Sequence, residues 1–134
     1  MHFTGPERND KIWGPRGTNS RHTPPGTEFR FYDDDQMELS TLSIASRFEK
    51  VTGVAGVYEA WKMLRPIAFR ADLWRLLVLW EHGGIYMDSD LVFLRQLSKF
   101  VDVDQDTVVI CQDPYMKRDD NAPMLWNALM AARR

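Results

Sequence analysis

The sequence predicts an α/β fold, because segments with helical periodicity alternate with short segments of β-branched and aromatic residues. The clearest helix covers residues 66–82, begins with Pro66 at a position suited to the first helical residue and stops at a glycine pair. It leads directly into the short apolar segment "IYM", which predicts a buried strand. A β-branched segment, "TVVIC" at 107–111, predicts another. Together these observations predict a sheet flanked by helices.

Length and composition indicate one modest globular domain spanning residues 1–134. The chain is 44% hydrophobic and contains five tryptophans, which is enough material for a core. Its formal charge of -2 comes from acidic and basic residues that are mixed along the chain. We therefore expect no basic surface for nucleic acid.

The single cysteine, Cys111, excludes a disulfide framework within the chain and a cysteine-based zinc site. No apolar stretch approaches the length of about 18 residues that a membrane-spanning helix needs, and no signal peptide opens the chain. We therefore expect no transmembrane segment in this chain. These features favour the cytoplasm as its location.

The N-terminal segment, residues 1–27, is rich in Gly, Pro, Asn and Ser and predicts a loop with a short strand near His2–Phe3. The next segment, "EFRFY" at 28–32, alternates polar and aromatic residues, which is typical of a half-buried strand. The first strands of the sheet are therefore expected at these two places.

Three helices are predicted in the middle of the chain. The first covers about 36–48, because Asp35 and Glu38 have the spacing of an N-cap and its capping-box partner. The second covers about 54–64, and the third is the helix at 66–82. In this third helix the apolar residues that recur at helical spacing predict the face buried in the core: Ile67, Leu73, Leu76, Leu77 and Trp80.

The C-terminal half is predicted to return to the sheet. "IYM" at 85–87 is a short buried strand that ends at Asp88, "VFL" at 92–94 is a further extended piece, and 107–111 is a strand. The final apolar segment, "APMLWNALMAA" at 122–132, predicts a closing helix.

Two aspartates, Asp88 and Asp90, follow the "IYM" strand at an interval of two residues. Residues i and i+2 of a regular strand share a face, so both carboxylates are expected to converge on one cation at the carboxyl edge of the sheet. Mg²⁺ or Mn²⁺ suits oxygen ligands, and a diphosphate would fill the coordination positions left open. The alternative for a bare D-x-D tripeptide is an Asx turn with a solvated second aspartate.

A longer pattern surrounds this pair in "FRADLWRLLVLWEHGGIYMDSD", residues 69–90. It contains R-A-D-x-x-R, a leucine-rich helix and G-G-x-Y-x-D-x-D in that order, carried by Arg70, Ala71, Asp72, Arg75, Gly83, Gly84, Tyr86, Asp88 and Asp90. The stretch closely resembles the glycosyltransferase family with a sugar-binding region containing the DXD motif. That family includes α-mannosyl-, galactosyl- and glucosyl-transferases and, more distantly, bacterial glucosylating toxins. The resemblance is close over about 24–97 and looser over 107–134.

The resemblance implies a GT-A-type nucleotide-sugar-binding fold and the use of Mn²⁺ or Mg²⁺. It implies transfer of a hexose from a UDP- or GDP-linked sugar to an acceptor, which the sequence leaves open among carbohydrate, lipid and protein. The relation to α-transferases implies retention of the anomeric configuration. Catalytic domains of this kind are longer than this chain, so three alternatives stay open: a fragment of such a domain, a minimal relative, or a non-catalytic nucleotide-sugar-binding module.

The resemblance also implies roles for individual residues. Asp90 would bind the metal directly, and Asp88 would bind it or hold hydroxyls of the donor. Asp72 and Arg75, one helical turn apart, would hydrogen-bond the donor sugar, or else form only an intrahelical salt bridge. Tyr86 would pack against the bound donor, or else be a strand aromatic in the core.

One further class of enzyme fits part of the same segment. "DSDLV" matches the D-x-D-x-V start of haloacid-dehalogenase-type phosphatases, in which the first aspartate, here Asp88, is a nucleophile. Those proteins place it after a longer apolar strand near the start of the chain. In this chain it follows a capped helix and only "IYM", so the phosphatase interpretation is the weaker one.

Overall fold

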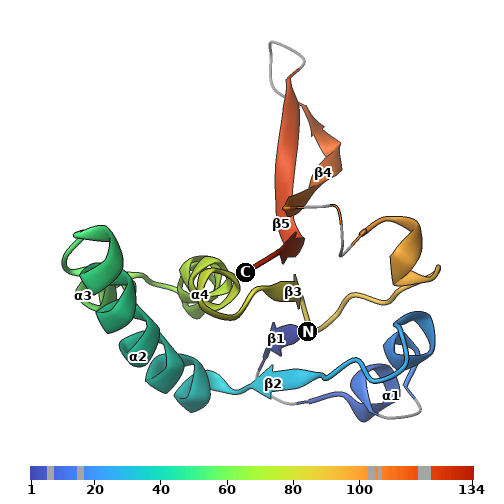
Figure 1. Ribbon diagram of the computed structural model, residues 1–134, viewed down its shortest axis with the longest axis horizontal. Coiled ribbons are helices and arrows are strands. Elements are labelled where there is room, and N and C mark those ends of the chain that lie inside the picture. Colours follow the sequence, from blue (N-terminus) through green and yellow to red (C-terminus); the bar gives the residue numbers. More distant parts are fainter. Residues whose placement is uncertain (6–7, 15–16, 103–104, 106, 118–121) are drawn as a thin grey trace.

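The computed structural model describes residues 1–5, 8–14, 17–102, 105, 107–117 and 122–134. Within these residues, five strands form one mixed sheet in the order β2-β1-β3-β5-β4 (Figure 1). The strands are β1 (His2–Thr4), β2 (Arg30–Tyr32), β3 (Gly84–Met87), β4 (Val108–Lys117) and β5 (Pro123–Ala132). The first three are parallel to one another, whereas β5 runs antiparallel to both β3 and β4. The α/β fold predicted from the sequence is confirmed.

Helices and irregular segments cover both faces of this sheet. The helices are α1 (Asp10–Trp13), α2 (Asp34–Thr52), α3 (Val57–Met63) and α4 (Ile67–His82), with 3₁₀ helices η1 (Asn19–His22) and η2 (Leu97–Lys99). Figure 1 shows α2, α3 and α4 on one side of the sheet, with α1 and the segment that contains η2 on the other. The segment 1–27, expected to be mostly loop, therefore contains a strand and two short helices.

Each face of the sheet has its own hydrophobic core. On the α2–α4 side the largest buried side chains include Trp61, Trp74 and Tyr86. On the other side, Ile85 and Met87 of β3 pack with a cluster that also contains Phe3, Trp13, Phe93 and Leu97. Successive β3 residues thus alternate between the two cores, because side chains in a strand alternate between its faces. This alternation places Tyr86 against α4.

Helix α2 begins two residues earlier than predicted. Its N-cap is Asp33, whose carboxylate accepts from the backbone N–H of Gln36 at 2.8 Å, while the Gln36 side chain accepts from the Asp33 N–H at 3.2 Å. This is a complete capping box. The run of three aspartates offers several caps, and Asp33 is used because β2 ends immediately before it. Glu38, the expected partner of Asp35, instead accepts a hydrogen bond from Tyr58.

Helix α4 ends at the glycine pair as predicted, with Gly83 and Gly84 at φ values of 63° and 88°, which strongly favour glycine. A Cβ on Gly83 would lie 2.9 Å from a backbone nitrogen, so the space also requires glycine. Pro66 is the N-cap rather than the first helical residue.

The predicted buried face of α4 was largely wrong. Of the five predicted residues, Leu77 is buried and Leu73 is partly buried, whereas Ile67, Leu76 and Trp80 are 46%, 55% and 37% exposed. Trp74 and Val78, which were not predicted, are buried. The helix is apolar on most of its circumference, so periodicity did not single out the face that packs on the sheet.

The segment 122–132 is a strand and not the predicted helix. As β5 it lies inside the sheet, where its inner half pairs with β3 from Gly84↔Ala132 to Met87↔Leu129 and with β4 on its other side. Residues such as Leu, Met and Ala favour helix locally, but pairing on both edges satisfies this backbone in the sheet. Residues 92–94, expected to be extended, form no strand.

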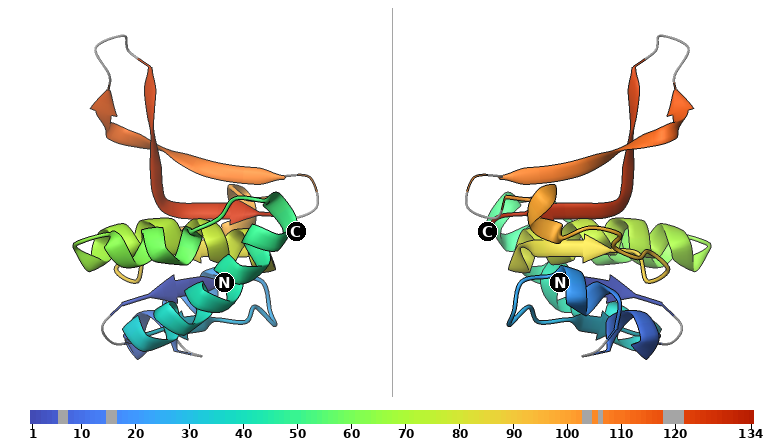
Figure 2. Two further views of the ribbon diagram at one scale, coloured as in Figure 1. Left: turned by 90° about the vertical axis from the view of Figure 1, so that its left-hand side faces the viewer. Right: turned by 90° about the vertical axis from the view of Figure 1, so that its right-hand side faces the viewer.

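The β4–β5 hairpin reaches beyond the body of the protein (Figure 2). Its inner half joins the sheet, and irregularities in pairing between Ile110 and Cys111 and between Gln112 and Lys117 accompany its bent course. Cys111 lies in this strand as predicted and is half-buried, which raises the pKa of its thiol. In the described part of the chain, no helix combines the length and apolar character needed to cross a bilayer.

Candidate functional site

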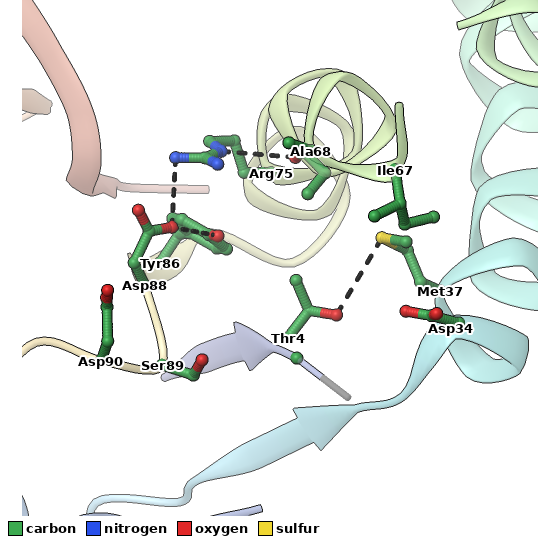
Figure 3. A pocket seen from close by; sticks show the side chains of 12 residues that line it. Thr4, Asp34, Met37, Ile67, Ala68, Arg75, Tyr86, Asp88, Ser89 and Asp90 are labelled. Atoms are coloured by element: carbon green, nitrogen blue, oxygen red, sulfur yellow. Dashed lines mark hydrogen bonds and ion pairs between the residues drawn. The ribbon is translucent and has the colours of Figure 1, made fainter. Parts of the chain in front are cut away.

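A cavity of about 460 Å³ opens where the carboxyl ends of β1 and β3 meet the first turns of α2 and α4 (Figure 3). Its lining residues are Thr4, Gly5, Asp34, Met37, Ile67, Ala68, Ala71, Arg75, Tyr86, Asp88, Ser89 and Asp90. Ligands of open α/β sheets bind at this edge, beyond the carboxyl ends of the strands. Four of the five predicted site residues line the cavity, and Asp72 is the one that does not.

Asp88 and Asp90 lie in a turn that directly follows β3, not in the strand itself. The backbone N–H of Leu91 donates to the carbonyl oxygen of Asp88 at 3.1 Å and closes the turn. We call residues 88–91 the carboxylate turn. Both aspartate side chains project from the same side of it, and Ser89 points elsewhere (Figure 3). The expected strand geometry was wrong, but the turn still brings both carboxylates to one cavity.

Asp88 is held from two sides. The hydroxyl of Tyr86 donates to its Oδ1 at 2.6 Å, and the guanidinium of Arg75 lies 3.3 Å from the same oxygen. Burial raises the pKa of Asp88, the Tyr86 hydrogen bond and the Arg75 charge oppose this rise, and the nearby charges of Asp90 and Asp72 add to it. The carboxylate therefore lies where an added cation would be favourable.

Arg75 links the helix α4, the carboxylate turn and β5. It is 5% exposed, forms an ion pair with Asp72 at 2.9 Å and donates to the backbone oxygen of Asn127 at 2.7 Å. The Asn127 side chain in turn donates to Asp72 at 3.0 Å. The expected i, i+3 pair of Asp72 and Arg75 is therefore present as a salt bridge, with β5 bound to both members.

Tyr86 is 1% exposed and belongs to the core on the α4 side. Its ring packs edge-on against Trp74, and the Arg75 guanidinium lies 4.5 Å from its centroid. The sequence left two alternatives for Tyr86, a contact with the donor or a place in the core. In the structure Tyr86 is a core residue that also borders the cavity.

Several residues near the site were missed in the sequence. Asn127 was predicted to lie in a helix, so there was no reason to expect its contacts with α4 from the sequence. Trp13 and Asn19 lie in the segment predicted to be loop, yet both are buried and hydrogen-bonded to the segment 89–93. Arg70, part of the recognised pattern, lies away from the cavity and donates to backbone oxygens at the end of α3. The contacts of Asn127, Trp13 and Asn19 join residues at least 52 positions apart in the chain, and no local sequence pattern indicates them.

The carboxylate turn suits a divalent cation of the oxygen-binding type. Asp90 is exposed and accepts no hydrogen bond from the described residues, and both contacts of Asp88 fall on Oδ1, which leaves Oδ2 for a ligand. Within the described residues, no group of three or more His, Cys, Asp or Glu is placed to hold a metal. The donor set therefore fits an open site of two carboxylates, completed by water or by a ligand's own oxygens.

Comparison with known proteins agrees with this geometry. A model of the family "Glycosyltransferase sugar-binding region containing DXD motif" matches residues 20–112, which is more than half of the chain. Searches of curated proteins and of solved structures gave no match. The mixed five-stranded sheet flanked by helices is consistent with a GT-A-like domain. The chain therefore belongs to the glycosyltransferase family that carries a sugar-binding region with a DXD motif.

Proposed function

We propose that this chain binds a UDP- or GDP-linked hexose in the cavity beyond β1 and β3 and acts in transfer of that hexose to an acceptor. A divalent cation, Mn²⁺ or Mg²⁺, would be held by Asp88 and Asp90. The observation that carries the proposal is the carboxylate turn, which presents two carboxylates to the cavity beside Arg75 and Tyr86. The family match supports the class of reaction.

The residues of the site have separate parts in this proposal. The bound cation would supply positive charge that stabilises a diphosphate leaving group. Tyr86 and Arg75 orient Asp88 through its Oδ1 and favour its ionised form. Asp72, whose side chain is 45% exposed, and Arg75 are proposed to hydrogen-bond the donor sugar. Kinship with α-transferases favours retention of the anomeric configuration.

A non-catalytic nucleotide-sugar-binding module is the second candidate. It is favoured by the small ligand set, because the described residues supply two carboxylates and no third metal-binding side chain beside them. The phosphatase interpretation has less support, because Asp88 follows helix α4 and the four-residue strand β3 and not a longer apolar strand near the start of the chain.

Isothermal titration calorimetry with UDP and with GDP, each with and without Mn²⁺, tests the binding step. We expect one nucleotide to bind only in the presence of Mn²⁺, and Asp90→Ala to abolish this binding. Asp35→Ala is the matched control, because Asp35 is also an exposed aspartate but lies outside the cavity. Failure of both nucleotides to bind the folded wild type would refute the proposal.

Incubation with the sugar nucleotide then separates the two candidates. A transferase should release free sugar slowly to water even without an acceptor, and Asp90→Ala should remove this release. A binding module should retain the intact sugar nucleotide over the same period. Mass spectrometry of the nucleotide fraction distinguishes these outcomes directly.

A further inference from the structure

A tryptophan of α1, from the core on the face of the sheet opposite α4, binds the backbone of the carboxylate turn. The indole Nε1 of Trp13 donates to the carbonyl oxygen of Ser89, the residue between the two aspartates, at 2.9 Å. Trp13 is 1% exposed, and its ring stacks on Phe3 of β1 with centroids 4.0 Å apart and an interplanar angle of 16°. The donor is therefore fixed in place by the core beneath the sheet.

A fully buried asparagine binds the last residue of the turn and the segment that follows it. The side chain of Asn19 donates from Nδ2 to the carbonyl oxygen of Leu91 at 3.0 Å and accepts at Oδ1 from the N–H of Phe93 at 2.7 Å. Asn19 is 0% exposed, so its amide lies away from water. An amide can donate and accept at once, as these two backbone groups require, whereas a carboxylate can only accept.

These three hydrogen bonds restrain a turn in which electrostatic repulsion favours opening. Two carboxylates two residues apart repel each other when no cation lies between them. Without restraint, the turn would relax to separate the charges, and binding a cation would then require the turn to be reordered. Groups that hold metal ligands in place commonly change metal affinity by about 10- to 100-fold when removed.

We propose that Trp13 and Asn19 are positioning residues that keep the carboxylate turn in its cation-binding conformation. The inference rests on the proposed function, because it explains the hydrogen bonds of Trp13 and Asn19 by the proposed metal site that they adjoin. Both residues precede the region matched by the family model, which begins at residue 20. Trp13 is separated from Ser89 by 76 positions in the sequence, and Asn19 from Leu91 by 72.

A pair of matched variants tests the proposal. Trp13→Phe keeps an aromatic ring on Phe3 and removes only the N–H donor and one ring. Trp61→Phe is the control, because Trp61 is also 1% exposed and its Nε1 also donates to a backbone oxygen at 2.9 Å, that of Arg70. Trp61 lies in α3, and neither it nor Arg70 lines the cavity. Both variants should therefore lose similar stability for the same chemical reason.

The measurement is Mn²⁺ affinity, from the electron paramagnetic resonance signal of the free ion, together with amide hydrogen exchange in the metal-free protein. We expect Trp13→Phe to weaken Mn²⁺ binding by about tenfold and to accelerate exchange at the Leu91 N–H. Trp61→Phe should match the wild type in both readouts. Wild-type Mn²⁺ affinity in Trp13→Phe would overturn the proposal, because a merely structural tryptophan would give that result.

Two further outcomes are decisive. If Trp13→Phe does not fold, Asn19→Asp takes its place, since it conserves size and the acceptor for Phe93 but loses the donor to Leu91. A tenfold weaker Mn²⁺ affinity in Asn19→Asp supports the proposal, and an unchanged affinity overturns it. If the wild type itself takes up no Mn²⁺, the proposed metal site fails and the positioning role fails with it.

Discussion

Replacing Arg75 with methionine should lower the free energy of unfolding by about 3 kcal/mol at pH 7. The charged hydrogen bond to the Asn127 oxygen at 2.7 Å contributes most, because such bonds contribute about 1.5–3 kcal/mol. The ion pairs with Asp72 and Asp88 add less, at most about 1 kcal/mol each, because both carboxylates are partly exposed. Methionine retains much of the apolar stem that packs beside Tyr86.

The loss should depend on pH in a defined direction. The charge of Arg75 lowers the pKa of Asp88, so the substitution should raise that pKa further above its value in the unfolded chain. An acid with a raised pKa in the folded state destabilises the protein above that pKa, and the penalty disappears as pH falls toward the unfolded value. The difference between variant and wild type should therefore be smaller at pH 4 than at pH 7.

Urea denaturation at both pH values measures these differences. Arg30→Met is the control, because Arg30 forms two hydrogen bonds of 2.9 Å with Glu28 at an exposed strand edge. We expect a much smaller loss there, with little dependence on the protonation of Asp88. Equal losses in the two variants, or an Arg75→Met loss that is the same at pH 4 and pH 7, would refute the reasoning.

Three other substitutions have expected outcomes. Asp90→Asn should leave the melting temperature unchanged or slightly raised, because it removes repulsion of Asp88, and should abolish any rise in melting temperature caused by Mn²⁺. Tyr86→Phe should cost about 1 kcal/mol in urea denaturation, because it removes the 2.6 Å hydrogen bond to Asp88. Burial, above all, lowers the pKa of His2 to about 4. The unfolded state thus binds more protons below pH 6.5, and wild-type stability should fall by about 3 kcal/mol by pH 4, a loss that His2→Gln should lack.

The parts of the fold that were predicted correctly depend on local signals. The glycine pair stops α4 because both positions require a positive φ, and this requirement is visible in the sequence alone. The short strands β1 and β3 were located from brief apolar segments beside turn residues. Such signals depend on a few neighbouring residues, so they can be interpreted from the sequence without knowledge of the tertiary structure.

The parts that were predicted wrongly depend on distant partners. β5 has the composition of a helix, and only its pairing with β3 and β4 makes it a strand. The mistake had a consequence for the site, because Asn127 of β5 bonds to both Asp72 and Arg75. The motif therefore identified four residues that line the cavity, Arg75, Tyr86, Asp88 and Asp90. The contacts of Asn127, which is outside the motif, were found only in the structure.

The charges around the cavity determine what the proposed ligand needs. Asp34, Asp88 and Asp90 line it together with one cationic side chain among the described residues, Arg75, which already pairs with Asp72 and Asp88. A nucleotide diphosphate approaching this surface would meet a net negative charge and be repelled. Nucleotide binding should therefore require a divalent cation, whereas Mn²⁺ should bind without nucleotide. Equal nucleotide affinity with and without Mn²⁺ would contradict this argument, and would direct attention to a cationic group outside the described lining.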